Sequence, residues 1–263
     1  MRVVDKPYWR LRDYLRAADK RRRRQQALSA AAAEVKAASK FDDSYGYRRV
    51  YHHLRNRGVA IGRECVRRLM GELGLQPPPP VKKKRNAPEV VATENWPDGR
   101  RLQIDATRFR FDDGVAWIYL VEDVKSRDCL AASAAPRLSK ERAAQTLLEA
   151  HQHLAAQGLA GARVVQSDGG SDFTSGHFQA LCEQIGCWVR CRVAQPGGMG
   201  ILERLNRTFK HEYIFRREVN TLAELQALLP DFKQWYNERR VHSSLGYRTP
   251  ASVLADEVAA VLS

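Results

Sequence analysis

The 263-residue sequence contains no run of 18 or more apolar residues, and its first residues lack the apolar segment of a secretion signal. A helix that spans a bilayer needs about 20 mainly apolar residues, so the first absence excludes helical membrane spans. The second absence argues against export. We therefore expect a cytoplasmic protein with no membrane partner.

Cysteine is also scarce, because the chain has only Cys65, Cys129, Cys182, Cys187 and Cys191. A small and odd number argues against a secreted, disulfide-bonded scaffold and favours reduced thiols. No two of them form the Cys-x-x-Cys pair with which zinc knuckles hold a tetrahedral ion. We expect neither a disulfide framework nor a zinc site.

Acidic residues are too few in the first part of the chain to balance its basic residues. Residues 1–100 hold 24 Lys and Arg against 11 Asp and Glu, and residues 101–263 hold 20 against 19. Nearly all of the formal charge of +14 therefore lies in the first 100 residues. Such a concentration favours a polyanionic partner, and we expect DNA, in the nucleoid.

This basic region divides into three segments by composition. Residues 1–44 contain the basic run Lys20 to Arg24 and an alanine-rich stretch, which predict a helical arm that either contacts DNA or is a solvated surface helix. In residues 45–76, apolar residues are spaced for two short amphipathic helices, with Gly58 at the turn. Residues 77–98 begin with four prolines and form a linker, because proline cannot continue a helix.

Two helices joined by a turn form a helix-turn-helix-like module, which lays a basic helix face on DNA. Small helical hairpins also serve as plain packing units, and charge runs are often only solvated, but the local charge favours DNA binding. The residues expected to contact DNA here are Arg63, Arg67 and Arg68 in the second helix and Lys82, Lys83, Lys84 and Arg85 in the linker.

After the linker the pattern changes from helical to mixed, in a core that we place at residues 99–217. Three short apolar runs separated by turn residues predict a meander, and helices then alternate with two further strands. This order predicts an α/β fold, a mixed five-stranded sheet flanked by helices, with a helical extension over residues 218–263. The expected strands are 102–111, 115–122, 129–135, 162–166 and 188–193, and the expected helices are 139–157, 176–186, 201–217 and 222–238.

Three acidic residues occupy special positions in this order. Asp105 lies in the middle of the first strand, and Asp168 directly follows the fourth strand, where Gly169 and Gly170 let the backbone turn sharply. Glu203 lies one turn into a helix, 35 positions after Asp168. Sites collect at the carboxyl ends of strands in sheets with helical crossovers, so we expect the three side chains to converge there.

Convergent carboxylates suit phosphodiester chemistry. Mg²⁺ prefers carboxylate, phosphate and water oxygens, and two ions about 4 Å apart activate a nucleophile and stabilise the leaving oxygen. Such chemistry needs no nucleophilic Ser or Cys. Most of the 30 acidic residues are ordinary surface groups, so the argument depends on position, strand order and spacing taken together.

The segments around the three acids resemble the integrase-core transposases of bacterial insertion sequences, which are encoded in the second of two overlapping frames and are related to retroviral integrases. The matching segments are IDATRF at Asp105, QSDGGSDFTS at Asp168, GILERLNRTFKHE at Glu203, and the ending WYNERRVHSSLGYRTPASVL. The segments YGYRRVYHHL and VRRLMGELGL are similar to the helical module that precedes the core in that family. The resemblance spans residues 45–254 and implies a ribonuclease H-like fold.

The resemblance implies a DDE-type enzyme in which Asp105, Asp168 and Glu203 bind two Mg²⁺ or Mn²⁺ ions. It also implies cleavage of transposon DNA ends and transfer of the freed 3′-hydroxyl into target DNA, by at least a dimer on DNA and with an upstream-frame DNA-binding protein as a partner. Arg207 and Lys210 lie four and seven residues beyond Glu203 on one helix face. They are expected to contact the transposon end, or else to serve solubility alone.

Two alternatives share this fold. One is a catalytically degenerate or domesticated relative that only binds DNA, which the intact acids disfavour. The other is a stand-alone ribonuclease H or Holliday-junction nuclease, which the basic front module and the ending from Trp235 onward disfavour. Asp123, at the end of the second strand, resembles a family acid that supports the core and is not counted among the catalytic residues.

Overall fold

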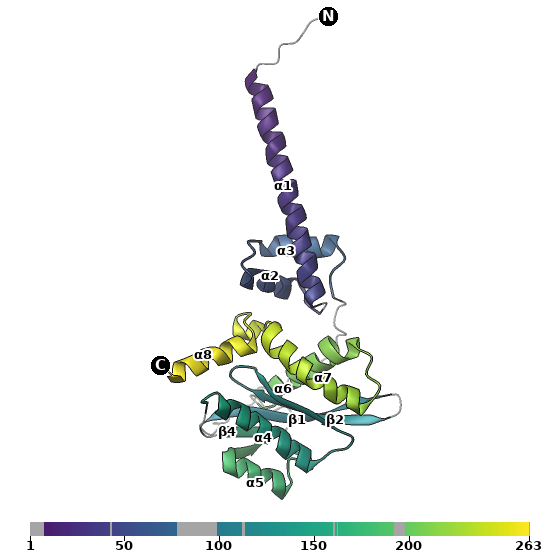
Figure 1. The fold of residues 1–263 in the computed structure, drawn as a ribbon, viewed down its shortest axis with the longest axis vertical. Helices are drawn as coiled ribbons and strands as arrows, with labels where there is room; N and C mark the ends of the chain where they lie inside the picture. The colour runs from purple at the N-terminus through teal and green to yellow at the C-terminus, as the bar shows by residue number, and fades with distance from the viewer. Residues whose placement is uncertain are drawn as a thin grey trace, which may run out of the picture. The chain divides into compact units, whose positions relative to one another are not determined.

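The computed structural model describes residues 8–42, 44–77, 99–111, 114–159, 161, 163–191 and 198–262. The chain divides into two compact units, Met1–Lys82 and Lys83–Ser263 (Figure 1). The basic run Lys82 to Arg85, predicted to contact DNA, lies outside the described residues. None of the helices in the described ranges is long and apolar enough to cross a membrane.

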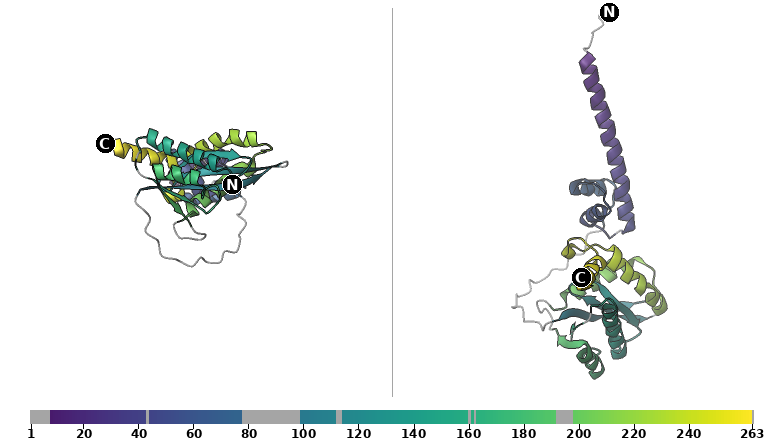
Figure 2. Two further views of the ribbon diagram at one scale, coloured as in Figure 1. Left: turned by 90° about the horizontal axis from the view of Figure 1, so that it is seen from below. Right: turned by 60° about the vertical axis from the view of Figure 1, so that its left-hand side comes forward.

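The first unit is built from helices α1 (Tyr8–Phe41), α2 (Tyr47–Asn56) and α3 (Arg63–Glu72). Helix α1 is a single straight rod in Figure 1 and in the right view of Figure 2. Gly58, with φ +78°, follows α2 at the predicted turn. The three helices share a small apolar core of Val35, Ala38, Val50, Leu54, Val66, Leu69 and Met70. The predicted pair of amphipathic helices is thus confirmed.

The second unit contains a five-stranded sheet with the strand order β3-β2-β1-β4-β5. β1 pairs antiparallel with β2, and β2 with β3, whereas β1, β4 and β5 are parallel neighbours. The predicted mixed sheet is therefore confirmed. The strands are β1 (Arg100–Arg110), β2 (Val115–Asp123), β3 (Cys129–Ala135), β4 (Arg163–Ser167) and β5 (Gly186–Arg190).

Helices cover both faces of the sheet. α4 (Lys140–Ala156) and α5 (Gly176–Ile185) pack on one face, where α8 (Pro250–Leu262) adds its residue Leu254 to the apolar core. α6 (Gly200–Thr208) and α7 (Leu222–Gln234) pack on the other face. Helix α4 begins where predicted, because Ser139 Oγ accepts a hydrogen bond from the backbone N–H of Arg142 at 3.1 Å. The apolar residues that the sequence spaces along one face of α4, namely Ala143, Leu147, Ala150 and Leu154, are fully buried.

Some element boundaries differ from the prediction. β5 begins at Gly186, directly after α5, and not at residue 188. The helix predicted over residues 201–217 is α6 followed by a π-helical turn (Phe209–Tyr213) and a 3-10 turn (Ile214–Arg216). Helix α7 likewise continues into a π-helical turn (Trp235–Arg239), and a 3-10 turn (Ser243–Leu245) follows.

Polar contacts attach the chain after α7 to the sheet. Tyr236 Oη donates a hydrogen bond to Glu122 Oε1 at 3.1 Å, where both side chains are buried. Asn237 accepts a hydrogen bond from the backbone N–H of Cys129 at 2.9 Å and donates one to Asp128 Oδ1 at 2.9 Å. The helical extension therefore packs on β2 and β3 through specific hydrogen bonds as well as apolar contacts.

Gly186 permits the direct junction between α5 and β5. A Cβ at this position would lie 1.9 Å from the carbonyl oxygen of Arg163 on β4. We therefore predict that Gly186→Ala lowers the free energy of unfolding by more than about 3 kcal/mol, because the backbone of β4 would have to move to relieve the contact. Gly176→Ala is the matched control, since a Cβ there meets nothing within 4 Å. Equal thermal melting temperatures for the two variants would contradict this account.

Asp128 makes stability depend on pH. Burial raises the pKa of Asp128 to about 7, against the opposing charge of Lys233. A carboxyl group with a raised pKa in the folded state stabilises the fold at low pH, and this contribution is lost as pH rises through about 7. We expect the unfolding free energy of the wild type, measured by urea denaturation, to decline between pH 4 and 8. We predict that Asp128→Asn makes this decline smaller by up to about 4 kcal/mol. The exposed Asp231, changed to Asn, should leave the wild-type slope unaltered.

Candidate active site

Asp105 lies on the face of β1 that α6 covers. Its neighbour Ile104 packs in the core with α4 and α5, so strand alternation turns Asp105 to the opposite face. Leu120, directly across from Asp105 on β2, belongs to the apolar cluster beneath α6 and α7. A partly buried carboxylate thus occupies a position where the neighbouring strand has an apolar side chain. Asn206 of α6 donates a hydrogen bond to Asp105 Oδ2 at 2.7 Å.

Asp168 directly follows β4, as predicted, and is exposed. β4 is the parallel neighbour of β1, and Gln103 pairs with Gln166 in the register of the two strands. Asp105 and Asp168 each lie two residues beyond that pair. Because the two strands are parallel, both acids lie toward the carboxyl ends of the strands. The Oδ1 atom of Asp168 accepts a hydrogen bond from the backbone N–H of Gly170 at 2.9 Å.

Gly169 and Gly170 serve a different purpose from the one predicted. The chain turns here, but neither glycine has a positive φ, so conformational freedom is not the reason for glycine. A Cβ on Gly169 would lie 2.3 Å from a guanidinium nitrogen of Arg190, and a Cβ on Gly170 would lie 2.8 Å from Asp172 Oδ1. Glycine therefore leaves space for these two side chains against the loop that carries Asp168.

Glu203 lies in the first turn of α6 and is exposed. The N-cap residue of this helix, Met199, provides no side-chain cap. Instead, the backbone N–H of Leu202 donates a hydrogen bond to Gln103 Oε1 at 2.9 Å. The start of the helix that carries Glu203 is thus attached to the strand that carries Asp105.

The charges of the other two acids act on Asp105. Burial raises the pKa of Asp105 to about 6, and the negative charges of Asp168 and then Glu203 act in the same direction. Hydrogen bonds from the Ala106 backbone and from Asn206 oppose this shift. Like charges raise the pKa of a carboxyl group only when they lie near it. Carboxylates from β1, from the end of β4 and from α6 therefore face a common region.

These carboxylates are not preassembled at the spacing of a metal shell. Across the part of the chain that the structure describes, no group of three or more His, Cys, Asp or Glu side chains gathers closely enough to hold a metal ion. Asp168 and Glu203 are exposed, so their side chains can reorient without loss of packing. The three acids offer the hard oxygen ligands that Mg²⁺ and Mn²⁺ prefer.

Two basic residues predicted to contact DNA lie beside this region. Arg207 is exposed on α6, one turn after Glu203. Lys210 lies in the π-helical turn that follows, where burial lowers its pKa and the charge of Asp105 opposes the shift. The side chain of Lys210 is therefore near Asp105. This arrangement places positive charge next to Asp105.

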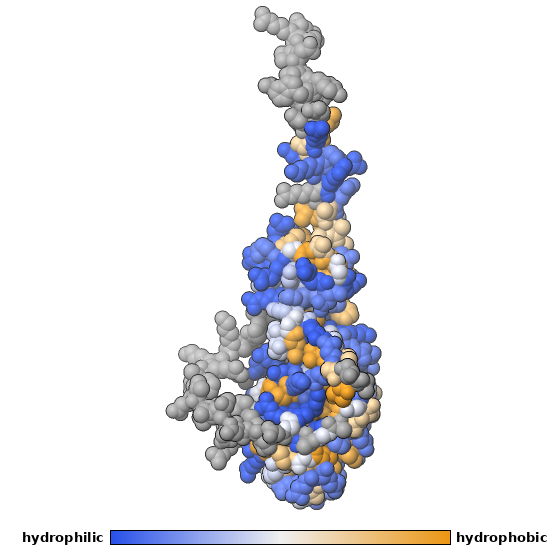
Figure 3. All heavy atoms as spheres, turned by 90° about the vertical axis from the view of Figure 1, so that its left-hand side faces the viewer, coloured by the Kyte–Doolittle hydropathy of each residue, from blue (hydrophilic) through white to orange (hydrophobic). Residues whose placement is uncertain are grey.

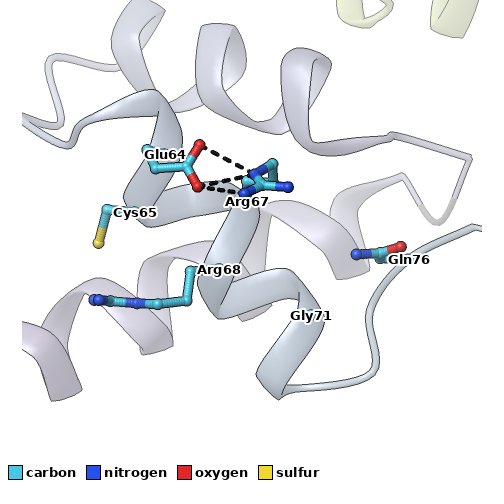
Figure 4. Close-up of a pocket in the computed structure, with 6 residues that line it drawn as sticks. All are labelled: Glu64, Cys65, Arg67, Arg68, Gly71 and Gln76. Atoms are coloured by element: carbon cyan, nitrogen blue, oxygen red, sulfur yellow. Dashed lines mark hydrogen bonds and ion pairs between the residues drawn. The ribbon is translucent and has the colours of Figure 1, made fainter.

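In the first unit, the predicted basic face of α3 is partly neutralised. Arg63, Arg67 and Arg68 are all exposed, but Arg67 forms an ion pair with Glu64 at 2.6 Å (Figure 4). Arg68 lies 3.6 Å from Glu72. Exposed ion pairs of this kind contribute little free energy, so a phosphate can displace the carboxylates. On the face of the molecule drawn in Figure 3, hydrophilic side chains dominate the surface of the first unit.

Sequence reasoning did not identify the contacts that three residues near the acids make. Asn206 bonds to Asp105, and Gln103 bonds to both Gln166 and the start of α6. The spacing of each of these residues from one of the acids is a signal that could have identified it. Asn206 lies three residues after Glu203 on the same helix. Gln103 on β1 lies two residues before Asp105, and Gln166 on β4 lies two residues before Asp168. Strand alternation places the glutamines on the same face as the acids.

Comparisons with known families agree with this architecture. Two family profiles described as "Integrase core domain" match residues 98–196 and 187–250, and a profile described as "HTH-like domain" matches residues 23–84. Together, the two core profiles span more than half of the chain.

Relatives and a solved structure point the same way. The protein InsK of insertion sequence element IS150 of Escherichia coli (strain K12) is 24% identical over 225 residues, covering 78% of this chain and 76% of its own length. The transposase of element IS904 of Lactococcus lactis subsp. lactis (strain IL1403) is 26% identical over 220 residues, covering 78% and 85%. The simian T-cell lymphotropic virus intasome structure with PP2A regulatory subunit B56 gamma contains a chain with the same fold, at 17% identity and a TM-score of 0.50, covering 77% of this chain and 74% of its own.

Proposed function

Because this chain belongs to the integrase-core family of insertion-sequence DNA transposases, as its motifs predicted, we propose that Asp105, Asp168 and Glu203 form its catalytic centre. The enzyme is a DDE-type polynucleotidyl transferase that acts on DNA. The observation that carries the assignment is geometric: the parallel register of β1 and β4 sets Asp105 and Asp168 each two residues beyond one paired position, and a hydrogen bond from Leu202, next to Glu203, attaches the start of α6 to β1. The three acids come from β1, the end of β4 and the first turn of α6.

The residues fit a site for two Mg²⁺ or Mn²⁺ ions. Repulsion among three carboxylates is relieved when cations lie between them, and carboxylate oxygens are the ligands that these ions prefer. When bound, two such ions activate the attacking oxygen and stabilise the leaving oxygen. Asp105, Asp168 and Glu203 would hold the ions, and Asn206 orients Asp105 through its hydrogen bond.

The same centre serves two displacements at phosphorus. In the first, a water oxygen attacks the phosphodiester at the element end, and the 3′-oxygen leaves to become a free 3′-hydroxyl. In the second, that hydroxyl attacks a phosphodiester of target DNA, a new bond forms to the 3′-oxygen, and the target's own 3′-oxygen leaves. Arg207 and Lys210, beside the acids, bind backbone phosphates of the element end and hold it in place.

The first unit supplies further DNA contacts through Arg63, Arg67 and Arg68 on α3. Residues 20–23 of the basic run on α1 are exposed, so they are also accessible to a duplex. Synapsis of two element ends requires at least a dimer on DNA, and an upstream-frame DNA-binding protein fits as a partner. No observation favours a degenerate relative or a ribonuclease over the transposase.

We predict that Asp105→Asn abolishes both donor cleavage and strand transfer with Mn²⁺, by more than about 100-fold, which exceeds the usual effect of an outer metal contact. Binding to end DNA, measured by fluorescence anisotropy, should remain within about twofold, because the change removes no phosphate contact. Asp256→Asn, at an exposed ion pair with Arg248, is the control and should retain full activity. Wild-type turnover by Asp105→Asn would refute the assignment.

We further predict that the α3 arginines determine the salt dependence of DNA binding. Each basic residue on a phosphate contributes about 0.9 to the slope of log affinity against log salt. Changing Arg63, Arg67 and Arg68 together to Gln should therefore reduce the slope by up to about 3. Arg142→Gln, on the sheet face opposite α6, should leave it unchanged. An unaltered slope in the triple variant would exclude α3 from the DNA interface.

A further inference from the structure

Gln103 is a fully buried polar side chain in the middle of the sheet. It lies in β1 between Leu102 and Ile104, which point into the apolar core on the other face. Its Nε2 group donates hydrogen bonds to Gln166 Oε1 at 3.0 Å and to the carbonyl oxygen of Gly198. Its Oε1 atom accepts the backbone N–H of Leu202 at 2.9 Å. One amide group thus joins β1 to β4 and to both sides of the start of α6.

Each contact of this amide lies close in sequence to one of the three acids. Gln103 precedes Asp105 by two residues, and Gln166 precedes Asp168 by two residues. Leu202 immediately precedes Glu203. In a strand, residues two apart lie on the same face at a separation of about 7 Å. Gln103 therefore lies on the segment that presents Asp105 and is bonded to the two segments that present Asp168 and Glu203.

Gln103 also supplies a cap that α6 lacks locally. The first four backbone N–H groups of a helix have no partner within the helix and need one from elsewhere. Met199, the N-cap residue, offers no side-chain cap, and Leu202 is the third residue of the helix. Gln103 Oε1 fills this role from a residue 99 positions away. The helix start is consequently fixed relative to β1 by a directional bond and not by apolar contact alone.

We propose that Gln103 is a positioning residue that sets the spacing of Asp105, Asp168 and Glu203 by capping α6 and bridging β1 to β4. This inference rests on the proposed function of the three acids. An amide suits the position because it places a donor and an acceptor in one planar group. An apolar side chain would leave three buried groups without this partner: the backbone N–H of Leu202, the backbone carbonyl of Gly198 and the side-chain carbonyl of Gln166.

The test is Gln103→Met, which keeps length and volume but removes all three bonds. Amide hydrogen exchange at residues 200–205 should become at least about tenfold faster, with exchange in α4 unchanged, because local opening of α6 loses its cap. Mn²⁺ binding, followed by the electron paramagnetic resonance of free Mn²⁺, should weaken about tenfold, which is the low end of the effect of groups that bond to a metal ligand directly. Raising Mn²⁺ should restore strand transfer in part.

Gln145→Met is the matched control, since Gln145 is exposed on α4 and bonds only to Glu149 on its own helix in the described structure. It should match the wild type in all three measurements. If Gln103→Met does not fold, Gln166→Met carries the test, because it removes a single one of the bonds and should accelerate exchange at residues 200–205 to a smaller degree. Wild-type exchange and Mn²⁺ affinity in the variant that folds would overturn the inference. The proposed function fails separately, if the wild-type chain shows no metal-dependent strand transfer.

Discussion

The parallel pairing of β1 with β4 is the interaction on which the candidate active site depends. It sets Gln103 beside Gln166 and so brings Asp105 and Asp168, 63 positions apart in the chain, to one side of the sheet. Antiparallel pairing would place the two acids at opposite ends of the strands. β1 can pair with β4 because its other edge is taken by β2 and the crossover through α4 returns the chain to the open edge.

The face beneath α6 combines apolar packing with buried polar groups. β2 contributes Ile118 and Leu120 to the apolar cluster under α6 and α7, whereas β1 contributes Gln103 and Asp105. Buried polar groups destabilise a fold unless they are hydrogen-bonded. Helix α6 provides those bonds, through Asn206 to Asp105 and through a backbone N–H to Gln103. The helix therefore covers the core and completes the site at once.

The ending that contributed to the family resemblance has a structural role. Tyr236 bonds to the buried Glu122, and Asn237 bonds to the start of β3. Just before this ending, Lys233 Nζ donates to the carbonyl oxygen of Leu130 at 2.7 Å. These contacts hold α7 on the face that α6 also covers. Asp123, expected to support the core, is buried and accepts hydrogen bonds from Ser126 and Arg100. Charged and polar motif residues far from the three acids thus maintain the fold that presents them.

The sequence by itself determined the order of strands and helices, the buried stripe of α4, the position of Asp168 after β4 and the concentration of charge in the first 100 residues. These are local properties, set by periodicity, turn residues and composition. Only the tertiary structure decided that Gly169 leaves space for Arg190 and that Gln103 caps α6. Such features depend on which side chains meet, and for Gln103 and Asp105 the partners lie about 100 positions away, beyond the reach of any local pattern.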